Sequence, residues 1–124
     1  MTDTRLLAYK AINEIVKGGY SNLVVKNALK TVADKQDKAF ITALVYGTIE
    51  RQITLDYQLK TLLKMNATPV ETLNLLRMGA YQLFYMDSVP DFAACDQTVQ
   101  VAKKIGVNSS FVNGVMRNLI RKGL

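Results

Sequence analysis

Two arginines near the C-terminus, Arg117 and Arg121, are the residues of this sequence best placed to act together on a ligand. They are four residues apart, so on a helix they share one face. Residues 97–124 contain no aspartate or glutamate and carry +5 of the net charge of +6. Such a concentration of positive charge is typical of surfaces that bind a polyanion, and RNA or DNA is the expected ligand. The basic residues expected to contact phosphates are Arg117, Arg121, Lys122, Lys103 and Lys104.

Gly114 lies three residues before Arg117 and therefore on the same side of the predicted helix. Glycine inside a helix costs about 1 kcal/mol relative to alanine, which indicates that another group approaches the backbone closely. A neighbouring helix and an RNA phosphate are the two explanations, and we slightly favour the helix. For Arg121 and Lys122 the alternative to RNA binding is a solvated helix end, where the helix dipole favours cations.

Lys103 and Lys104 of the fifth predicted helix, next to Arg5 and Lys10 of the first, would extend the basic surface only if these two helices lie on the same side of the protein. Arg77 is the only cation between residues 65 and 96, where the net charge is −3. We expect Arg77 to have a structural role instead of an RNA contact. Its expected ion-pair partner is Glu50, Asp37 or Asp56.

Aromatic and sulfur-containing side chains offer two further candidates. Tyr81 and Tyr85 are four residues apart beside a leucine stripe, so packing at the edge of the core is favoured over stacking on bases. Cys95 falls on the apolar stripe of its helix, and the sequence has no histidine to activate it. We interpret Cys95 as a small buried residue.

The length and composition predict one folded domain. A chain of 124 residues can bury one hydrophobic core but not two, and 49% of the residues are apolar. One cysteine and no histidine exclude a disulfide framework and a zinc site of the usual kinds. No apolar run approaches the roughly 18 residues that span a bilayer, and the N-terminus resembles neither a signal nor a transit peptide. We expect a cytoplasmic protein with no membrane or metal partner.

Apolar residues recur every three or four positions along the sequence, which predicts an all-α fold without strands. The first helix should end at Gly18-Gly19. The second should begin at Ser21 or Asn22, bury Leu23 and Val24, and end near Asp34.

Later helices have sharper boundaries. The series that begins at Asp37 runs to Leu63 as one bent helix or two, with Gly47 and Thr54 as candidate breaks. Thr68-Pro69-Val70-Glu71 has the pattern of a capped helix start, with Thr68 as the cap and Glu71 reaching back to it. Asp87 to Pro90 separates this helix from the next, which should end at Gly106. Asn108 or Ser109 should open the last helix, and Asn113-Gly114 should lie within it.

Catalysis is not predicted for this chain. There is no histidine, no Gly-rich loop after a strand, and no close pair of carboxylates in a recognisable arrangement. Acid-base or phosphoryl chemistry would need one of these. The residues favour a binding protein.

Several segments together resemble the NusB-like RNA-binding family, in order and spacing, over nearly the whole chain. Within the family the resemblance is closest to the N-terminal domain of the RsmB (Sun) type of small-subunit rRNA cytosine-C5 methyltransferase, because of the VYGT and FVNGVMR sequences. The segments are Leu44-Val45-Tyr46-Gly47-Thr48 with Arg51, Leu76 to Leu83, Val89-Pro90, Thr98-Val99 with Ala102-Lys103-Lys104, and Phe111 to Arg117.

The resemblance implies a helical bundle of two antiparallel subdomains, of about three and four helices, that binds RNA. In such a methyltransferase a downstream Rossmann-like domain holds S-adenosylmethionine and a pair of cysteines. Cys95 follows Ala94 and not the proline of the family's catalytic motif, so this chain is expected to be non-catalytic and without cofactor. We expect it to be the N-terminal part of a longer methyltransferase whose linker begins near Leu124.

Three hypotheses for the function follow. The leading one is a domain that positions small-subunit rRNA for a C-terminal methyltransferase domain of the same protein. The second is a free-standing antitermination factor that binds nascent RNA together with a ribosomal protein. The third is a protein-interaction module that docks a partner such as the catalytic domain.

Overall fold

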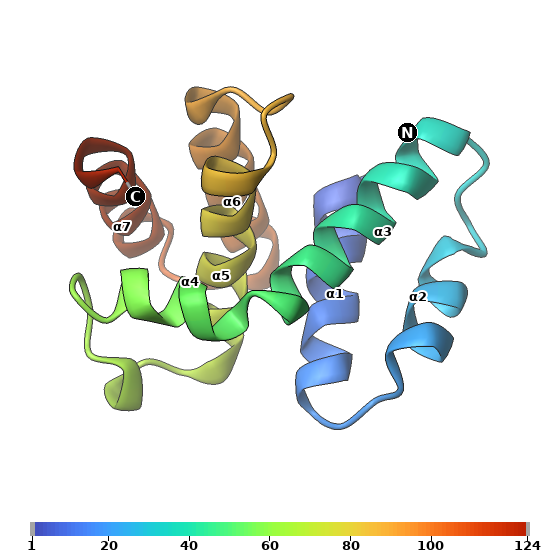
Figure 1. The fold of residues 1–124 in the computed structure, drawn as a ribbon, viewed down its shortest axis with the longest axis horizontal. Helices are drawn as coiled ribbons and strands as arrows, with labels where there is room; N and C mark the ends of the chain where they lie inside the picture. Colours follow the sequence, from blue (N-terminus) through green and yellow to red (C-terminus); the bar gives the residue numbers. More distant parts are fainter. Residues whose placement is uncertain (1, 124) are drawn as a thin grey trace.

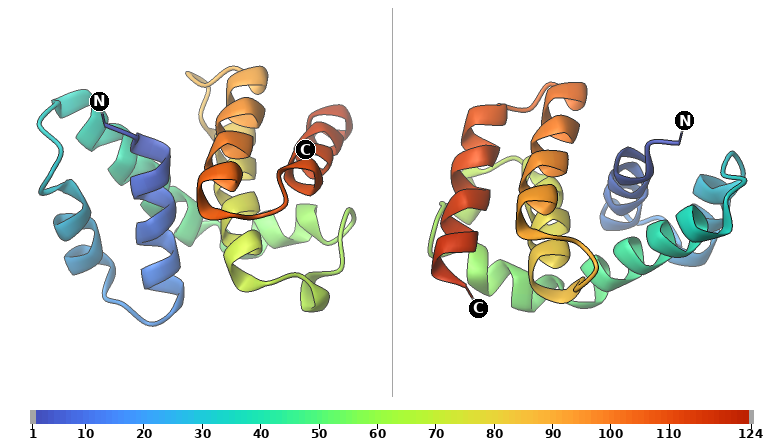
Figure 2. Two further views of the ribbon diagram at one scale, coloured as in Figure 1. Left: turned by 180° about the vertical axis from the view of Figure 1, so that it is seen from behind. Right: turned by 90° about the horizontal axis from the view of Figure 1, so that it is seen from above.

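The computed structural model describes residues 2–123, and every regular element in this range is a helix (Figure 1). The first three helices along the chain pack together as an N-terminal subdomain, and the last four pack together as a second one. Figure 2 shows the two subdomains side by side. The expected all-α fold of two subdomains is therefore confirmed. The helices are α1 (Thr4–Val16), α2 (Ser21–Leu29), α3 (Lys35–Glu50), α4 (Gln52–Leu59), α5 (Val70–Tyr85), α6 (Asp91–Ile105) and α7 (Ser109–Lys122), with one 3₁₀ turn, η1 (Met65–Ala67), before α5.

Helix α5 is the centre of the protein. It packs against α1 and α3 of the first subdomain and against α4, α6 and α7 of the second. All residues from Thr72 to Ala80 are buried, so this helix has no solvated face along its middle. A helix surrounded in this way joins the two subdomains through a common core.

Two glycines allow α5 to approach its neighbours. A Cβ atom at Gly79 would lie 2.8 Å from the Sδ of Met116 and 2.9 Å from the Oγ1 of Thr98, so α6 and α7 both pack against this point. A Cβ atom at Gly47 would overlap the phenol ring of Tyr81, so Gly47 serves the contact between α3 and α5. The expectation that Gly47 or Thr54 breaks the helix is wrong. The break is at Arg51, between α3 and α4.

A chain of polar side chains crosses the core from α4 to α1. Arg77 donates from Nε and Nη2 to the two carboxylate oxygens of Asp56, at 2.7 and 2.9 Å. Its Nη1 donates to Asn74 Oδ1 at 2.9 Å, and Asn74 Nδ2 donates to Asn13 Oδ1 at 2.6 Å. Because buried polar groups are costly without partners, this network helps to set how α1, α4 and α5 fit together.

Most predicted helix boundaries agree with the structure. The differences concern the cap of α5 and the end and buried face of α2. Helix α5 begins at Val70 as expected, but Thr68 does not cap it, because the Thr68 hydroxyl donates to the Lys64 carbonyl at 2.7 Å. The predicted capping box is therefore wrong. Helix α2 ends at Leu29, well before Asp34, and Leu23 is 54% exposed. Val25, not Leu23, accompanies Val24 in the core because the helix is rotated relative to the prediction.

The last two helices follow the sequence closely. Gly106 ends α6 in the left-handed conformation, with φ of 79°, which suits a residue without Cβ. Asn108 caps α7 by accepting from the Phe111 N–H at 3.1 Å. The hairpin of α6 and α7 is thus defined by local signals at its turn. Between residues 2 and 123, no helix has the length and apolar character needed to cross a membrane.

Candidate nucleic-acid interface

Helix α7 divides its side chains sharply between core and solvent. Val112, Val115, Met116 and Leu119 are buried, and they recur at the spacing of one helix face. The rest of the helix is largely polar and exposed, and its basic residues lie in the final turns, where the helix dipole favours positive charge. From Gly114 to the end of the helix the exposed residues are Gly114, Arg117, Asn118, Arg121 and Lys122.

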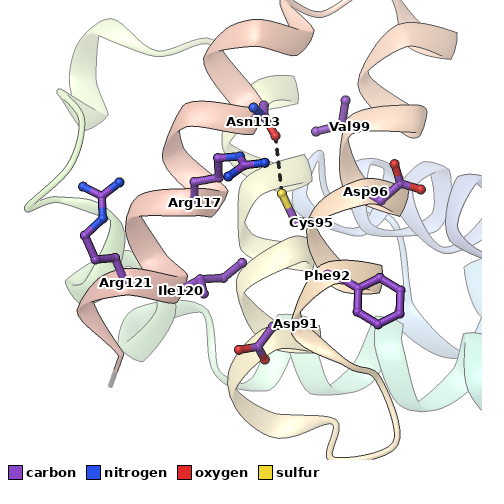
Figure 3. Close-up of a pocket in the computed structure, with 9 residues that line it drawn as sticks. All are labelled: Asp91, Phe92, Cys95, Asp96, Val99, Asn113, Arg117, Ile120 and Arg121. Carbon is purple, nitrogen blue, oxygen red and sulfur yellow. Dashed lines mark hydrogen bonds between the residues drawn. The ribbon is translucent and has the colours of Figure 1, made fainter.

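Arg117 and Arg121 lie together beside a groove between α6 and α7 (Figure 3). Arg117 points across the groove towards Asn113 and Cys95, whereas Arg121 points outward at its edge. Within residues 2–123, no carboxylate lies within 4.0 Å of either guanidinium. Both charges are therefore available to a ligand.

The groove has a volume of about 720 Å³ and walls of opposite charge. The α7 wall carries Arg117 and Arg121, and the α6 wall carries Asp91 and Asp96. The side chain of Phe92, 76% exposed, lies at the outer edge of α6. The remaining lining residues, between the walls, are Cys95, Val99, Asn113 and Ile120.

Cys95 is held inside this groove and is 8% exposed. Its Sγ lies 3.5 Å from Asn113 Oδ1, to which the thiol donates. Burial raises the pKa of the Cys95 thiol, the nearby Arg117 opposes this rise, and Asp96 adds to it. A thiol with a raised pKa is a poor nucleophile, in keeping with the interpretation of Cys95 as a buried packing residue.

The other predicted phosphate contacts do not gather at this groove. Lys122 donates to the Thr61 hydroxyl at 2.7 Å and so points towards the loop after α4. Lys103 and Lys104 lie at the opposite end of α6 from Asp91, roughly 18 Å away along a helix that rises about 1.5 Å per residue. The five cations of the C-terminal segment therefore occupy three places.

Lys104 is also partly neutralised, because it forms an ion pair with Asp3 near the start of α1. Burial raises the pKa of the Asp3 carboxyl, but the hydrogen bond from Lys104 and the one from the Leu6 N–H lower it by more. The net result is a lowered pKa. Lys103, by contrast, is exposed and has no carboxylate within 4.0 Å among residues 2–123.

Gly114 is not explained by helix packing. A Cβ atom at this position would meet no atom within 4 Å. The favoured interpretation, close approach of a neighbouring helix, is therefore wrong, and that role belongs to Gly79. The alternative, close approach of a phosphate to α7, stays a prediction.

The two N-terminal candidates lie in other surroundings. Arg5 is half-buried, donates from Nε to Gln82 Oε1 at 2.6 Å, and its guanidinium carbon lies 5.0 Å from the centre of the Phe40 ring. Burial lowers the pKa of Arg5, while Asp3 opposes the change. Lys10 is exposed on α1, which α6 separates from α7 (Figure 2). Neither residue extends the surface around Arg117, and their contact with RNA stays a prediction.

The residues expected to be structural make defined contacts. Of the three proposed partners of Arg77, the structure selects Asp56. Tyr81 stacks on Tyr85 with ring centres 5.5 Å apart and packs onto Gly47. The part of the chain that the structure describes contains no group of three or more acidic or cysteine side chains that could hold a metal ion.

Sequence reasoning missed the groove itself. It singled out Arg117, Arg121 and Cys95 but not Phe92, Asp91, Asp96 or Asn113. A signal was present, since Asp91, Cys95 and Val99 are spaced four apart and share a helix face. What the sequence did not reveal is that this face of α6 lies beside Arg117 of α7.

The fold places the protein in a known class of helical domains. A crystal structure of the antitermination factors NusB and NusE in complex with dsRNA superposes with a TM-score of 0.87 at 19% identity, over 98% of this chain and 96% of that one. At this identity the likeness establishes the fold, which is that of NusB.

The family follows from the sequence comparison. The model of the NusB family matches residues 2–121, so the chain belongs to the NusB family. It is 37% identical to the probable ribosomal RNA small subunit methyltransferase B of Bacillus subtilis (strain 168), over 99% of this chain but 29% of that protein. It is 28% identical to the transcription antitermination protein NusB of Bacillus licheniformis, over 89% of this chain and 90% of that one. The chain thus spans less than a third of the methyltransferase relatives that it matches.

Proposed function

We propose that this chain is a non-catalytic RNA-binding domain that positions ribosomal RNA for the catalytic domain of a small-subunit rRNA cytosine-C5 methyltransferase. The observation that carries the proposal is the pair Arg117 and Arg121, exposed on α7 with no carboxylate within 4.0 Å among residues 2–123. Guanidinium groups bind phosphate oxygens through paired N–H donors. Such contacts orient an RNA without selecting its sequence.

The choice of a methyltransferase parent is supported by the relatives. The identity to the Bacillus subtilis methyltransferase extends over 99% of this chain. The parent would need S-adenosylmethionine. A Rossmann-like site for such a cofactor consists of a strand, a Gly-rich loop and a helix, and no strand occurs between residues 2 and 123. In this proposal the cofactor belongs to a further domain, and the described residues contribute only RNA binding. We expect the protein to work in the cytoplasm, where ribosomal RNA is modified.

The test is the salt dependence of RNA binding. For single-stranded RNA, the logarithm of the binding constant falls with the logarithm of salt concentration by about 0.7 per neutralised phosphate. The double variant Arg117→Ala/Arg121→Ala should therefore reduce the slope by about 1.4. The matched control is Lys26→Ala/Lys30→Ala, which removes two exposed charges at α2 in the other subdomain. The same slope in wild type and in the arginine variant would contradict the proposal.

A free-standing antitermination factor is the second candidate, because the Bacillus licheniformis NusB matches over 90% of its length. It would bind nascent RNA together with a ribosomal protein. The reading frame beyond codon 124 separates the two candidates: a methyltransferase domain there supports the first, and a stop codon supports the second.

The third hypothesis, a protein-docking module, makes a different prediction. It requires affinity for the catalytic domain added as a separate chain, with no RNA binding at moderate salt. Calorimetric titration of the domain with each ligand distinguishes it from the other two.

A further inference from the structure

The groove between α6 and α7 is asymmetric in a way that phosphate binding alone does not require. Basic side chains stand on the α7 side and the carboxylates of Asp91 and Asp96 on the α6 side. A phosphate is attracted to Arg117 and Arg121 and repelled by the opposite wall. A bound RNA strand must therefore place its backbone along α7, with anything that enters the groove pointing towards α6.

The size and lining of the groove suit a nucleotide. Its volume of about 720 Å³ is within the range of roughly 300–1,000 Å³ found for small-molecule sites. Val99, Ile120 and the buried Cys95 offer apolar surface to the face of a base. The exposed ring of Phe92 lies on the side of α6 away from Arg117 (Figure 3), so it offers an aromatic surface to a neighbouring base of the strand and not to the base in the groove.

The carboxylate of Asp91 selects the edge of the base that enters the groove. A carboxylate only accepts hydrogen bonds, and the carboxylate of Asp91 points into the groove towards the end of α7 (Figure 3). Asn113 Oδ1 already accepts from the Cys95 thiol. At Asp91, a base edge with adjacent N–H donors therefore fits better than an edge that presents only carbonyl oxygens.

We propose that the groove receives one unpaired nucleotide of a single-stranded RNA, with backbone phosphates of the strand at Arg117 and Arg121 and the N–H donors of the base directed to Asp91. This inference rests on the proposed RNA-binding function. Guanine matches best, because its N1–H and N2–H₂ groups present two parallel donors to one carboxylate. Uracil matches worst, because its single N–H lies between two carbonyl oxygens that the carboxylate repels.

The charge pattern favours RNA over a peptide as the occupant. Arg117 and Arg121 have no carboxylate within 4.0 Å among residues 2–123. They therefore suit a ligand that carries phosphate groups, which an ordinary peptide segment does not. A nucleotide carries its negative charge on the phosphate and its N–H donors on the base, at opposite ends. The phosphate end matches the arginines of α7, and the base end matches the carboxylates of α6. One nucleotide therefore meets both walls at once.

The test compares two fluorescently labelled RNA decamers by anisotropy, one of uridines only and one with a single central guanosine. The wild-type chain should bind the guanosine decamer at least about fivefold more tightly, the lower limit for a good two-bond contact to a base edge. The variant Asp91→Asn should lose this preference. Its affinity for the uridine decamer should stay equal or rise slightly, because a negative charge near the phosphate is removed.

The matched control is Asp87→Asn, which makes the same change in charge at an exposed turn outside the groove. It should keep the preference for guanosine. Thermal unfolding of both variants should match that of the wild type to within a few degrees, so that lost selectivity is not lost folding.

Each result has one meaning. Equal wild-type affinities for the two decamers, with both lowered by Arg117→Ala/Arg121→Ala, overturn the base pocket and leave the proposed function intact. A preference that persists in Asp91→Asn also overturns the pocket. No binding of either decamer by the wild type contradicts the proposed function together with the pocket, and a protein segment then becomes the better occupant.

Discussion

Replacement of Arg77 tests how α4 is held against α5 within the second subdomain. Arg77→Ala would remove three hydrogen bonds, two to Asp56 and one to Asn74. The Arg77 side chain is 9% exposed and that of Asp56 is 29% exposed. The substitution therefore leaves a largely buried carboxylate and a buried amide oxygen without their donor.

The magnitude follows from the burial of the pair. Removing one partner of a buried ion pair costs about 3–5 kcal/mol. Because Asp56 keeps some contact with water, we expect the lower end, about 3 kcal/mol. For a domain of this size such a loss lowers the melting temperature by roughly 10 °C.

The assay is urea unfolding followed by circular dichroism at 222 nm, with Arg51→Ala as the matched control. Arg51 is exposed, and its guanidinium carbon lies 4.2 Å from the centre of the Tyr85 ring. Its removal should cost less than about 1 kcal/mol, the usual value of an exposed cation–π contact. A double-mutant cycle with Asp56→Asn should show coupling, because the two side chains are in direct contact. Additive effects, or a loss below about 1 kcal/mol for Arg77→Ala, would refute the structural role assigned to this ion pair.

Three further predictions concern the glycines and the charges. Gly79→Ala should destabilise the fold by about 1–3 kcal/mol through overpacking against Met116 and Thr98. Gly114→Ala should stabilise the fold by up to about 1 kcal/mol, because the new methyl group meets open space. Equal changes in the free energy of urea unfolding for the two variants would contradict the packing described. If a phosphate approaches Gly114 closely, Gly114→Ala should also weaken RNA binding, and unchanged affinity would exclude that approach. The pKa of Asp3 is lowered from 3.8 by folding, so its contribution to stability is present above this value and is lost as the pH falls through the folded-state pKa. Asp3→Asn should therefore lower the melting temperature at pH 7 but not at pH 2, and an equal deficit at both values would show that the carboxylate charge is not the cause.

The sequence was most informative where local chemistry decides the structure. The left-handed Gly106 and the Asn108 cap were predictable because each acts on its own helix end. The start of α5 at Val70 was predictable too, although Thr68 does not provide the cap. Its hydroxyl finds the Lys64 carbonyl in the preceding turn, a competing contact that depends on η1.

Features that depend on packing between distant segments were not predictable in the same way. Gly47 and Gly114 were both interpreted from helix propensity, yet Gly47 serves contact with Tyr81 and Gly114 faces open space. The role of Arg77 as an ion-pair residue followed from its isolation among acidic residues, but the choice of Asp56 depends on how α4 lies against α5.

The candidate interface was predicted in part. The arginine pair on α7 was visible from spacing and charge. The sequence did not show that Lys122 turns to Thr61, that Lys104 pairs with Asp3, or that Asp91 faces the arginines across a groove. The residues brought together are 61 positions apart for Lys122 and Thr61 and 101 for Lys104 and Asp3, separations that helical periodicity does not address.

Titration of ¹⁵N-labelled protein with single-stranded RNA tests the central claim most directly. If RNA binds through the arginine pair, backbone amide shifts should concentrate on the groove side of α6, from Asp91 to Val99, and on α7 from Asn113 to Arg121. The amides of α2 around Lys26 should change little. Shifts confined to α1, α2 and α3, with α7 unaffected, would contradict the account.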